Sequence, residues 1–286
     1  MKHYSFIALF FIGLVLQCSA TRTLTDDLGR RVLIPHHPHR LVCLIPNVTD
    51  TVFALGAGSD VVGVSDYTKY PPEARQKPSV GLPLSPSLET ILSLHPDLVL
   101  GSGDLNLVQS VEQLEHEGIP IFMIKSHGVE GIYSSILSLG KALDRESGAS
   151  QLVAHLRARE QAVQARVRGK DVVRIFMPVW YDPIITMGKN AFITELISIA
   201  GGKSVSDDIA QDWPQVSLEA IVARAPEAIL LTRDSKISIQ DLSGRPGWER
   251  LPAIRDHRVY YVSDKIDLPS PAAFDALEEL AKQLHP

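Results

Sequence analysis

The chain has 286 residues, of which 45% are hydrophobic and 21% are charged, and its formal net charge is −5. This composition is typical of a globular protein, and the length is one at which a single hydrophobic core tends to divide into two. The slightly acidic balance provides no broad basic surface, so we expect no nucleic-acid partner.

The first 20 residues are typical of an export signal. Lys2 precedes an unbroken apolar run over residues 6–16, and Cys18-Ser19-Ala20 follows it. The run is too short to span a bilayer and is followed by small residues, so we predict a signal peptide at residues 1–20, cleaved after Ala20. Acylation of Cys18, as in a lipoprotein, is the alternative. Under both interpretations the protein is exported, to the periplasm or otherwise out of the cytoplasm.

Only Cys43 remains after this cleavage, so the mature chain cannot form an intramolecular disulfide. Cys43 lies in the apolar run of residues 41–45, which is typical of a buried strand. Because an apolar environment raises the pKa of a thiol, we expect a core cysteine and not a reactive one.

Residues 21–130 predict an N-terminal α/β lobe. Alternating residues around Asp27-Leu28-Gly29 indicate a β-hairpin at residues 23–34. Further strands are predicted at residues 41–45, 61–64, 98–100 and 119–124, and helices at residues 48–55, 87–94 and 105–117. This alternation is typical of a parallel sheet with helices on both faces.

Three histidines, His36, His37 and His39, follow the hairpin in a proline-containing loop. Clustered imidazoles raise the alternative function of a metal-ion receptor. No carboxylate or cysteine stands nearby in the sequence to complete a site. We therefore favour a solvated surface loop and predict no metal site.

Residues 131–168 are predicted to form bridging helices between two lobes. The longer helix covers residues 145–167, with Leu152, Leu156, Val163 and Val167 on one apolar stripe and arginines on the other faces. At a rise of 1.5 Å per residue it is about 35 Å long, close to the width of a small domain. Because one packed helix lacks the flexible paired strands of a hinge, we expect the two lobes to move little relative to each other.

Residues 169–286 predict a second α/β lobe. Its predicted strands cover residues 172–179, 228–231 and 258–262, and its helices cover residues 191–200, 217–224 and 271–284. The run Ser217-Leu218-Glu219 repeats Ser87-Leu88-Glu89, and a proline recurs at the same offset. The two lobes are therefore predicted to be two units of one design.

The repeated serine is placed to cap its helix, and the glutamate then lies in the first turn, where a negative charge is favoured by about 0.3–1 kcal/mol. Local stabilisation could explain one such glutamate. Matching glutamates on both lobes are better explained by paired contacts with a two-fold partner, where close charged pairs couple by about 1.5–7 kcal/mol. We predict that Glu89 and Glu219 are docking residues.

Two stretches of the chain resemble the sequences of a known protein family. The run Asp212-Trp213-Pro214-Gln215-Val216-Ser217-Leu218-Glu219, and Val62-Gly63-Val64-Ser65 with Tyr67 and Tyr70, resemble the helical-backbone periplasmic proteins of ABC importers that bind cobalamin (vitamin B12) or iron chelates. The resemblance covers essentially the whole mature chain. It implies two Rossmann-like lobes rigidly bridged by one long α-helix, with a ligand in the cleft between them.

The resemblance also implies a partner. In the family, the glutamates that match Glu89 and Glu219 meet arginines of the membrane permease, here expected to be an ABC permease dimer. It implies a carried corrinoid such as cobalamin, no cofactor of the protein's own, and a monomer when free.

Aromatic side chains after the predicted strands are candidates for the walls of a cleft that holds a large flat ligand. By the resemblance, Tyr67 and Trp213 fall on cobalamin-contacting positions and Asp264 on a polar one. The complete set of predicted ligand-binding residues is Tyr67, Tyr70, Trp180, Tyr181, Trp213 and Asp264.

Three departures from the family pattern keep other ligands open. Pro83 and Ser102 stand where the family's cobalamin site has tryptophans, and Leu268 stands where it has an arginine. Haem would need an iron ligand, for which the candidates are Tyr67, Tyr181 and His127. Anionic siderophores would need several arginines in the cleft, and few are available. A corrinoid remains the favoured ligand.

The sequence offers little support for an enzyme. It has no Gly-x-Ser-x-Gly elbow, no phosphate-binding loop and no His-Glu-x-x-His pair. Asp207-Asp208 is better explained as a solvated turn than as a catalytic pair. We predict a binding protein without catalytic residues.

Overall fold

The computed structural model describes residues 20–104, 108–235 and 237–286. Most of the predicted signal peptide, Cys18 included, lies outside these residues, as does the start of the helix predicted at residues 105–117. Within the described part of the chain, every helix is too short or too polar to cross a membrane.

The N-terminal lobe is built on a four-stranded parallel sheet with the strand order β4-β3-β7-β8. Its strands are β3 (Leu41–Cys43), β4 (Val61–Val64), β7 (Leu98–Ser102) and β8 (Ile121–Ile124). Two antiparallel hairpins are added, β1 (Thr21–Thr25) with β2 (Arg31–Pro35) and β5 (Gly81–Leu82) with β6 (Ser85–Pro86). The helices are α1 (Pro46–Ala54), α2 (Leu88–Ser93), α3 (Val108–His116) and α4 (Gly128–Ala142), with 3-10 turns η1 (Gly58–Asp60) and η2 (Pro72–Gln76).

The C-terminal lobe repeats this plan with the parallel strand order β12-β9-β13-β14. Its strands are β9 (Val173–Phe176), β12 (Gly202–Ser204), β13 (Ala228–Thr232) and β14 (Val259–Val262), with a separate hairpin of β10 (Pro178–Tyr181) and β11 (Ile184–Thr186). The helices are α6 (Phe192–Ile199), α7 (Leu218–Arg224), α8 (Ile239–Ser243), α9 (Pro252–Arg255) and α10 (Ala273–Leu284), with 3-10 turns η3 (Trp248–Arg250) and η4 (Asp264–Asp267).

The single strand predicted at residues 172–179 is wrong in its extent. The structure divides it into β9, which pairs within the parallel sheet, and β10, which pairs only with β11. Pro178 begins β10, and because proline lacks a backbone N–H it does not continue a central strand. The hairpin therefore leaves the sheet and carries Trp180 and Tyr181 away from it.

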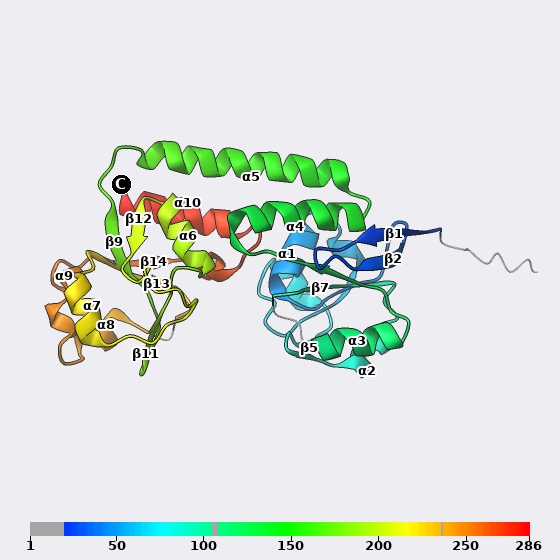
Figure 1. The fold of residues 1–286 in the computed structure, drawn as a ribbon, viewed down its shortest axis with the longest axis horizontal. Helices are drawn as coiled ribbons and strands as arrows, with labels where there is room; N and C mark the ends of the chain where they lie inside the picture. Colours follow the sequence, from blue (N-terminus) through cyan, green and yellow to red (C-terminus); the bar gives the residue numbers. More distant parts are fainter. Residues whose placement is uncertain (1–19, 105–107, 236) are drawn as a thin grey trace, which may run out of the picture.

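The predicted bridge is helix α5 (Glu146–Val167), which lies along one side of the molecule across both lobes (Figure 1). Ala149, Val153, Leu156 and Val163 are buried along one stripe. The polar side of α5 is also attached: Arg159 donates from Nε to Glu278 of α10 at 2.6 Å. Helix α5 contacts α4 and α10, so it bridges the two lobes as expected.

The hydrophobic core is continuous between the lobes. One cluster runs from the N-terminal sheet through α4 and α5 into α6 and α10, and includes Leu100, Ile136, Leu156, Leu196 and Leu277. Cys43 belongs to this cluster, and burial raises the pKa of its thiol to about 12, as expected for a core cysteine. A core shared in this way opposes hinge motion, because opening a hinge would expose apolar surface. The proposed domain limits at residues 130 and 168 stay a prediction.

A second contact between the lobes lies at the start of α4. Val129 N donates to Glu195 Oε2 of α6 at 2.9 Å, which places a carboxylate where a helix N-terminus favours negative charge. Gly128 has a φ of 71°, and a Cβ atom there would lie 2.8 Å from the same carboxylate oxygen. Glycine is therefore required for this close approach.

The predicted repeat extends to detailed geometry. Ser87 and Ser217 each accept a hydrogen bond from the backbone N–H three residues on, at 3.2 Å. The helices are followed by left-handed residues, His95 and Ala225, with φ of 46° and 45°. An arginine from the first parallel strand region of each lobe donates to a carbonyl at this end of the helix: Arg40 to His95 and Arg174 to Ala225.

Candidate functional site

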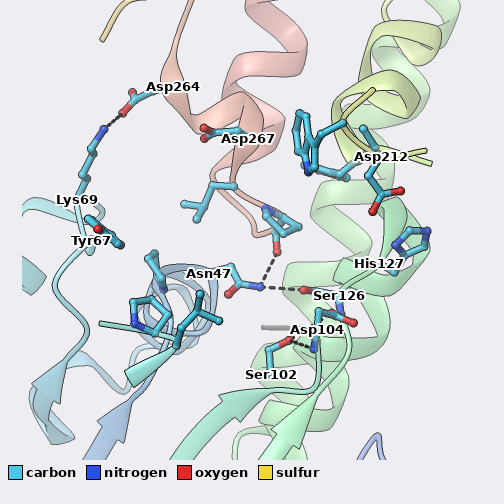
Figure 2. A pocket seen from close by; sticks show the side chains of 18 of the residues that line it. Asn47, Tyr67, Lys69, Ser102, Asp104, Ser126, His127, Asp212, Asp264 and Asp267 are labelled. Carbon is cyan, nitrogen blue, oxygen red and sulfur yellow. Dashed lines mark hydrogen bonds and ion pairs between the residues drawn. The ribbon is translucent and has the colours of Figure 1, made fainter. Parts of the chain in front are cut away.

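A cleft of about 720 Å³ lies between the two lobes. Figure 2 shows loops of both lobes around it. In the N-terminal lobe these loops follow β3, β4, β7 and β8, and in the C-terminal lobe one of them follows β14. The carboxyl ends of parallel strands are the usual place for ligands in α/β sheets, so this cleft is the candidate binding site.

Two exposed aromatic residues line the cleft from different lobes. Tyr67 follows β4 and is 64% exposed, and Trp213 precedes α7 and is 50% exposed. The hairpin β5–β6 adds apolar surface, with Leu82 and Leu84 largely exposed. Large apolar side chains that stay exposed in a concave site are suited to bury a flat, partly apolar ligand.

One side of the cleft is joined by polar contacts between the lobes. The Tyr70 hydroxyl donates to Asp264 Oδ1 at 2.5 Å, and Lys69 Nζ lies 3.3 Å from Asp264 Oδ2. Lys69 also forms an ion pair with Asp234. Figure 2 shows the contact between Lys69 and Asp264. The hydrogen bond to Asp234 raises the pKa of Lys69, and burial followed by the bond to Asp264 raises that of Tyr70.

The floor of the cleft is a network of short polar side chains. Asn47 Nδ2 donates to Ser126 Oγ at 2.8 Å and lies 3.5 Å from the carbonyl oxygen of Pro269 in the other lobe. Asp104 Oδ2 accepts from the backbone N–H of Ser126 at 3.0 Å (Figure 2). Ser102, which stands at a family tryptophan position, donates to the same carboxylate oxygen at 3.2 Å.

A buried carboxylate supports this floor from below. Asp50 of α1 accepts from Ser270 Oγ at 2.7 Å and from the backbone N–H of Ala272 at 3.0 Å. Burial raises the pKa of Asp50, and these two hydrogen bonds from the other lobe oppose that rise. The contact therefore fixes the start of α10 against α1.

The cleft is acidic. Its charged lining residues among those described are Asp104, Asp212, Asp264, Asp267 and Lys69. The lysine is already paired across the cleft, whereas the Asp267 side chain faces the open space (Figure 2). Solvent in the cleft reaches one side of Asp267, and protein surrounds the rest of the side chain. This partial burial is the largest cause that raises the pKa of Asp267 to about 6, and the negative charges of Asp234 and Asp264 add to it.

Trp180 and Tyr181 lie outside the main cleft. They line a second cavity of about 290 Å³ that shares Trp213 and Asp267 with the cleft. Their rings are stacked, with centroids 6.1 Å apart and an interplanar angle of 13°. Of the six predicted ligand-binding residues, the structure brings Tyr67, Tyr70, Trp213 and Asp264 to one cleft and places the other two beside it.

The histidines considered as candidate ligands lie in different parts of the molecule. His127 lines the cleft. His36 and His37 lie beside Asp144, at 3.8 and 3.3 Å, and His39 lies 3.8 Å from Asp60. Within the part of the chain that the structure describes, no three histidine, cysteine or acidic residues are grouped so that they could hold a metal ion.

Glu89 and Glu219 occupy the first turns of α2 and α7, and both are exposed. Figure 1 shows these two helices on the side of the molecule away from α5. Among the described residues, neither carboxylate has a salt-bridge partner. The two charges are therefore available to a partner that approaches this side.

Several residues of the cleft were not predicted, above all Lys69, Asp212 and Asp267. Each had a signal in the sequence: Lys69 stands between Tyr67 and Tyr70, Asp212 precedes Trp213, and Asp267 follows Asp264 by three residues. Further cleft residues could therefore have been predicted among the loop neighbours of each predicted site residue.

Comparison with known proteins places the chain in a family. The model of the periplasmic binding protein family matches residues 41–266. The chain belongs to this periplasmic binding protein family. The match spans both sheets and most of the residues that line the cleft.

Individual relatives support the assignment. This periplasmic binding protein is 32% identical to YvrC of Bacillus subtilis, an uncharacterized ABC transporter substrate-binding lipoprotein, over 92% of this chain and 85% of the relative. It is 29% identical to a vitamin B12-binding protein of Vibrio parahaemolyticus, over 85% and 88% of the two chains. The heme-binding protein RhuT of Roseiflexus sp. RS-1 has a similar structure, with a TM-score of 0.80 and 26% identity over 86% and 98%.

These comparisons confirm the predicted family and the predicted fold class of two α/β lobes bridged by one long helix. The relatives and the structural neighbour are named as binding proteins, which agrees with the predicted class of function.

Proposed function

We propose that this protein is the exported substrate-binding protein of an ABC importer. It captures a corrinoid, a cobalamin-like ligand, in the cleft between its lobes and delivers it to the membrane permease. Family membership and the names of the relatives support the general role. We further propose that the protein is a monomer when free and has no cofactor of its own.

The observation that carries the choice of ligand is the combination of size, exposed aromatic residues and charge in one cleft. Its volume of about 720 Å³ is within the usual range of about 300–1,000 Å³ for pockets that hold small-molecule ligands. Tyr67 and Trp213 offer ring surface from opposite lobes. A flat macrocycle between them would bury apolar area on both sides.

Charge favours a corrinoid over haem and over anionic siderophores. A cobalamin ring carries amide side chains, whose N–H groups donate to carboxylates such as Asp212 and Asp267. Haem carries two carboxylates, which an acidic lining with one paired lysine would repel.

Haem remains the second candidate on two observations. A neighbouring structure is that of a heme-binding protein, and Tyr67 and His127 both line the cleft, where either could approach an iron atom. Tyr181, the third predicted haem ligand, lies in the adjoining cavity. The acidic charge of the lining supports the corrinoid over haem.

The proposal is tested with the purified exported protein. Its thermal unfolding midpoint and absorption spectrum are measured with cobalamin, cobinamide, haem and a ferric siderophore, each at the same concentration. We expect the two corrinoids to raise the midpoint, because a ligand that binds only the folded state stabilises it. A larger rise with haem, together with a shifted haem absorption band, would replace the corrinoid assignment by the haem one.

Delivery is proposed to depend on Glu89 and Glu219. Each is exposed in the first turn of its helix, and the two helices lie on the same side of the molecule (Figure 1). Two arginines of a two-fold symmetric permease would then meet one glutamate each. Opposite charges in such an interface increase the association rate as well as the affinity.

A further inference from the structure

We propose that the second cavity is a subsite of the ligand cleft that receives a flat aromatic group carried by the ligand. For a corrinoid this group is the base of its nucleotide. The inference rests on the proposed function and extends it, because it separates complete corrinoids from those without a nucleotide.

The second cavity adjoins the cleft. Trp213 and Asp267 line both spaces, so the two cavities meet at these side chains. The second cavity has a volume of about 290 Å³ against about 720 Å³ for the cleft. The smaller value is at the lower end of the range for independent ligand pockets, which favours an appendage of the cleft ligand as its occupant.

The aromatic wall of this cavity is held in place before any ligand arrives. Trp180 is 52% exposed, yet its indole Nε1 donates to the carbonyl oxygen of Asp182 at 2.8 Å. Its ring stacks on Tyr181, which in turn lies 4.1 Å from the guanidinium carbon of Arg245. An exposed ring with its orientation fixed on two sides loses little conformational freedom when a second ring stacks on it.

The remaining wall suits a heteroaromatic group and not a purely apolar one. Met177, Pro178 and Ile237 supply apolar surface, while Thr232 and Ser235 line the same cavity with hydroxyl groups. Hydroxyl groups can both donate and accept hydrogen bonds, so they can pair with ring nitrogens. A benzimidazole or purine base combines a stacking face with such nitrogens.

The test compares two corrinoids with and without the nucleotide, cobalamin and cobinamide, in equilibrium titrations of matched tryptophan variants. Stacking of one base on an aromatic side chain contributes about 1–3 kcal/mol. Trp180→Ala is therefore expected to weaken cobalamin binding about ten-fold or more and to leave cobinamide binding unchanged. Trp213→Ala, which removes a ring shared by both spaces, is expected to weaken both ligands.

Trp180→Phe serves as the conservative variant and is expected to retain most of the cobalamin affinity. Thermal unfolding of each variant without ligand shows whether it is folded. Equal effects of Trp180→Ala on both corrinoids, or no effect on either, would overturn the inference and leave the proposed function intact. If the unchanged protein bound neither corrinoid, the proposed function would fail first.

Discussion

The two lobes share one scaffold but differ in the loops that face the ligand. Helices α2 and α7 have the same serine cap and the same exposed glutamate, and an arginine closes each at its end. The cleft loops have no such correspondence. The N-terminal lobe lines the cleft with the leucine-bearing hairpin β5–β6, whereas the C-terminal hairpin β10–β11 lies beside the cleft and lines the second cavity.

This difference agrees with the two roles proposed for the two surfaces. A two-fold partner would present the same group twice, and two glutamates in the same local geometry would suit it. A single ligand presents different groups to each lobe, so the cleft loops are free to differ.

The largest effect is expected from charge reversal on the duplicated surface. Glu89→Lys and Glu219→Lys should each lower ligand uptake by cells about ten-fold or more, because close interface charge pairs couple by about 1.5–7 kcal/mol. The affinity of the purified protein for its ligand should stay the same. Uptake by cells and titration of the purified variants measure the two quantities separately.

Glu146→Lys is the matched control, since Glu146 is exposed in the first turn of α5, on the other side of the molecule (Figure 1). It should leave uptake unchanged. Loss of ligand affinity in either docking variant, or equal loss of uptake in the control, would remove the special role of the two glutamates.

The next effect concerns the divergent surface. Tyr67→Ala and Trp213→Ala should each weaken corrinoid binding about 10–100-fold, because burial of one large ring contributes about 1.5–3 kcal/mol. Leu33→Ala, which removes an equally exposed apolar side chain far from the cleft on β2, is the control and should change nothing. A ligand affinity that survives both aromatic substitutions would place the binding site elsewhere.

A smaller effect is expected from Asp267, whose pKa is raised to about 6 by burial and by neighbouring carboxylates. The folded protein keeps this proton to a higher pH than the unfolded chain, so the group costs stability as the pH rises from about 4 to about 6. Asp267→Asn should therefore stabilise the protein above pH 6, by about 1 kcal/mol after allowance for solvent screening. Below pH 4 the variant should match the unchanged protein.

Denaturant unfolding at pH 4 and pH 7.5 measures this difference. Asp256→Asn is a suitable control, because Asp256 is an exposed aspartate at the end of α9. A stabilisation of the same size at both pH values would show that the Asp267 proton is not responsible.

The smallest effect is expected in the position of one lobe relative to the other when ligand binds. The core continues through α4, α5 and α10, and Asp50 joins α1 to the start of α10. Small-angle scattering with and without ligand should therefore give nearly superimposable curves. A marked contraction on ligand binding would show that the shared core does not hold the lobes.

The sequence predicts the scaffold well because the scaffold is encoded locally. A serine cap, a first-turn glutamate and a following proline can be recognised within about ten residues, and they occur twice. Tyr67, Trp213 and Asp264 were predicted to share a site because they match family positions in loops, and the structure brings them to one cleft.

The remaining features depend on contacts between distant residues. The pairing of Lys69 with Asp234 and the hydrogen bond from Ser270 to Asp50 join different lobes and have no local pattern. The position of Trp180 and Tyr181 depends on how Pro178 interrupts the strand and sends a hairpin away from the sheet. Sequence periodicity does not record that change of direction.

The most direct measurement of the central claim is a competitive equilibrium titration of the purified exported protein with cobalamin and haem. We expect one cobalamin bound per chain, an affinity reduced by Trp213→Ala, and no displacement of cobalamin by an equal concentration of haem. Displacement of cobalamin by haem, or cobalamin binding that is indifferent to Trp213, would contradict the central claim.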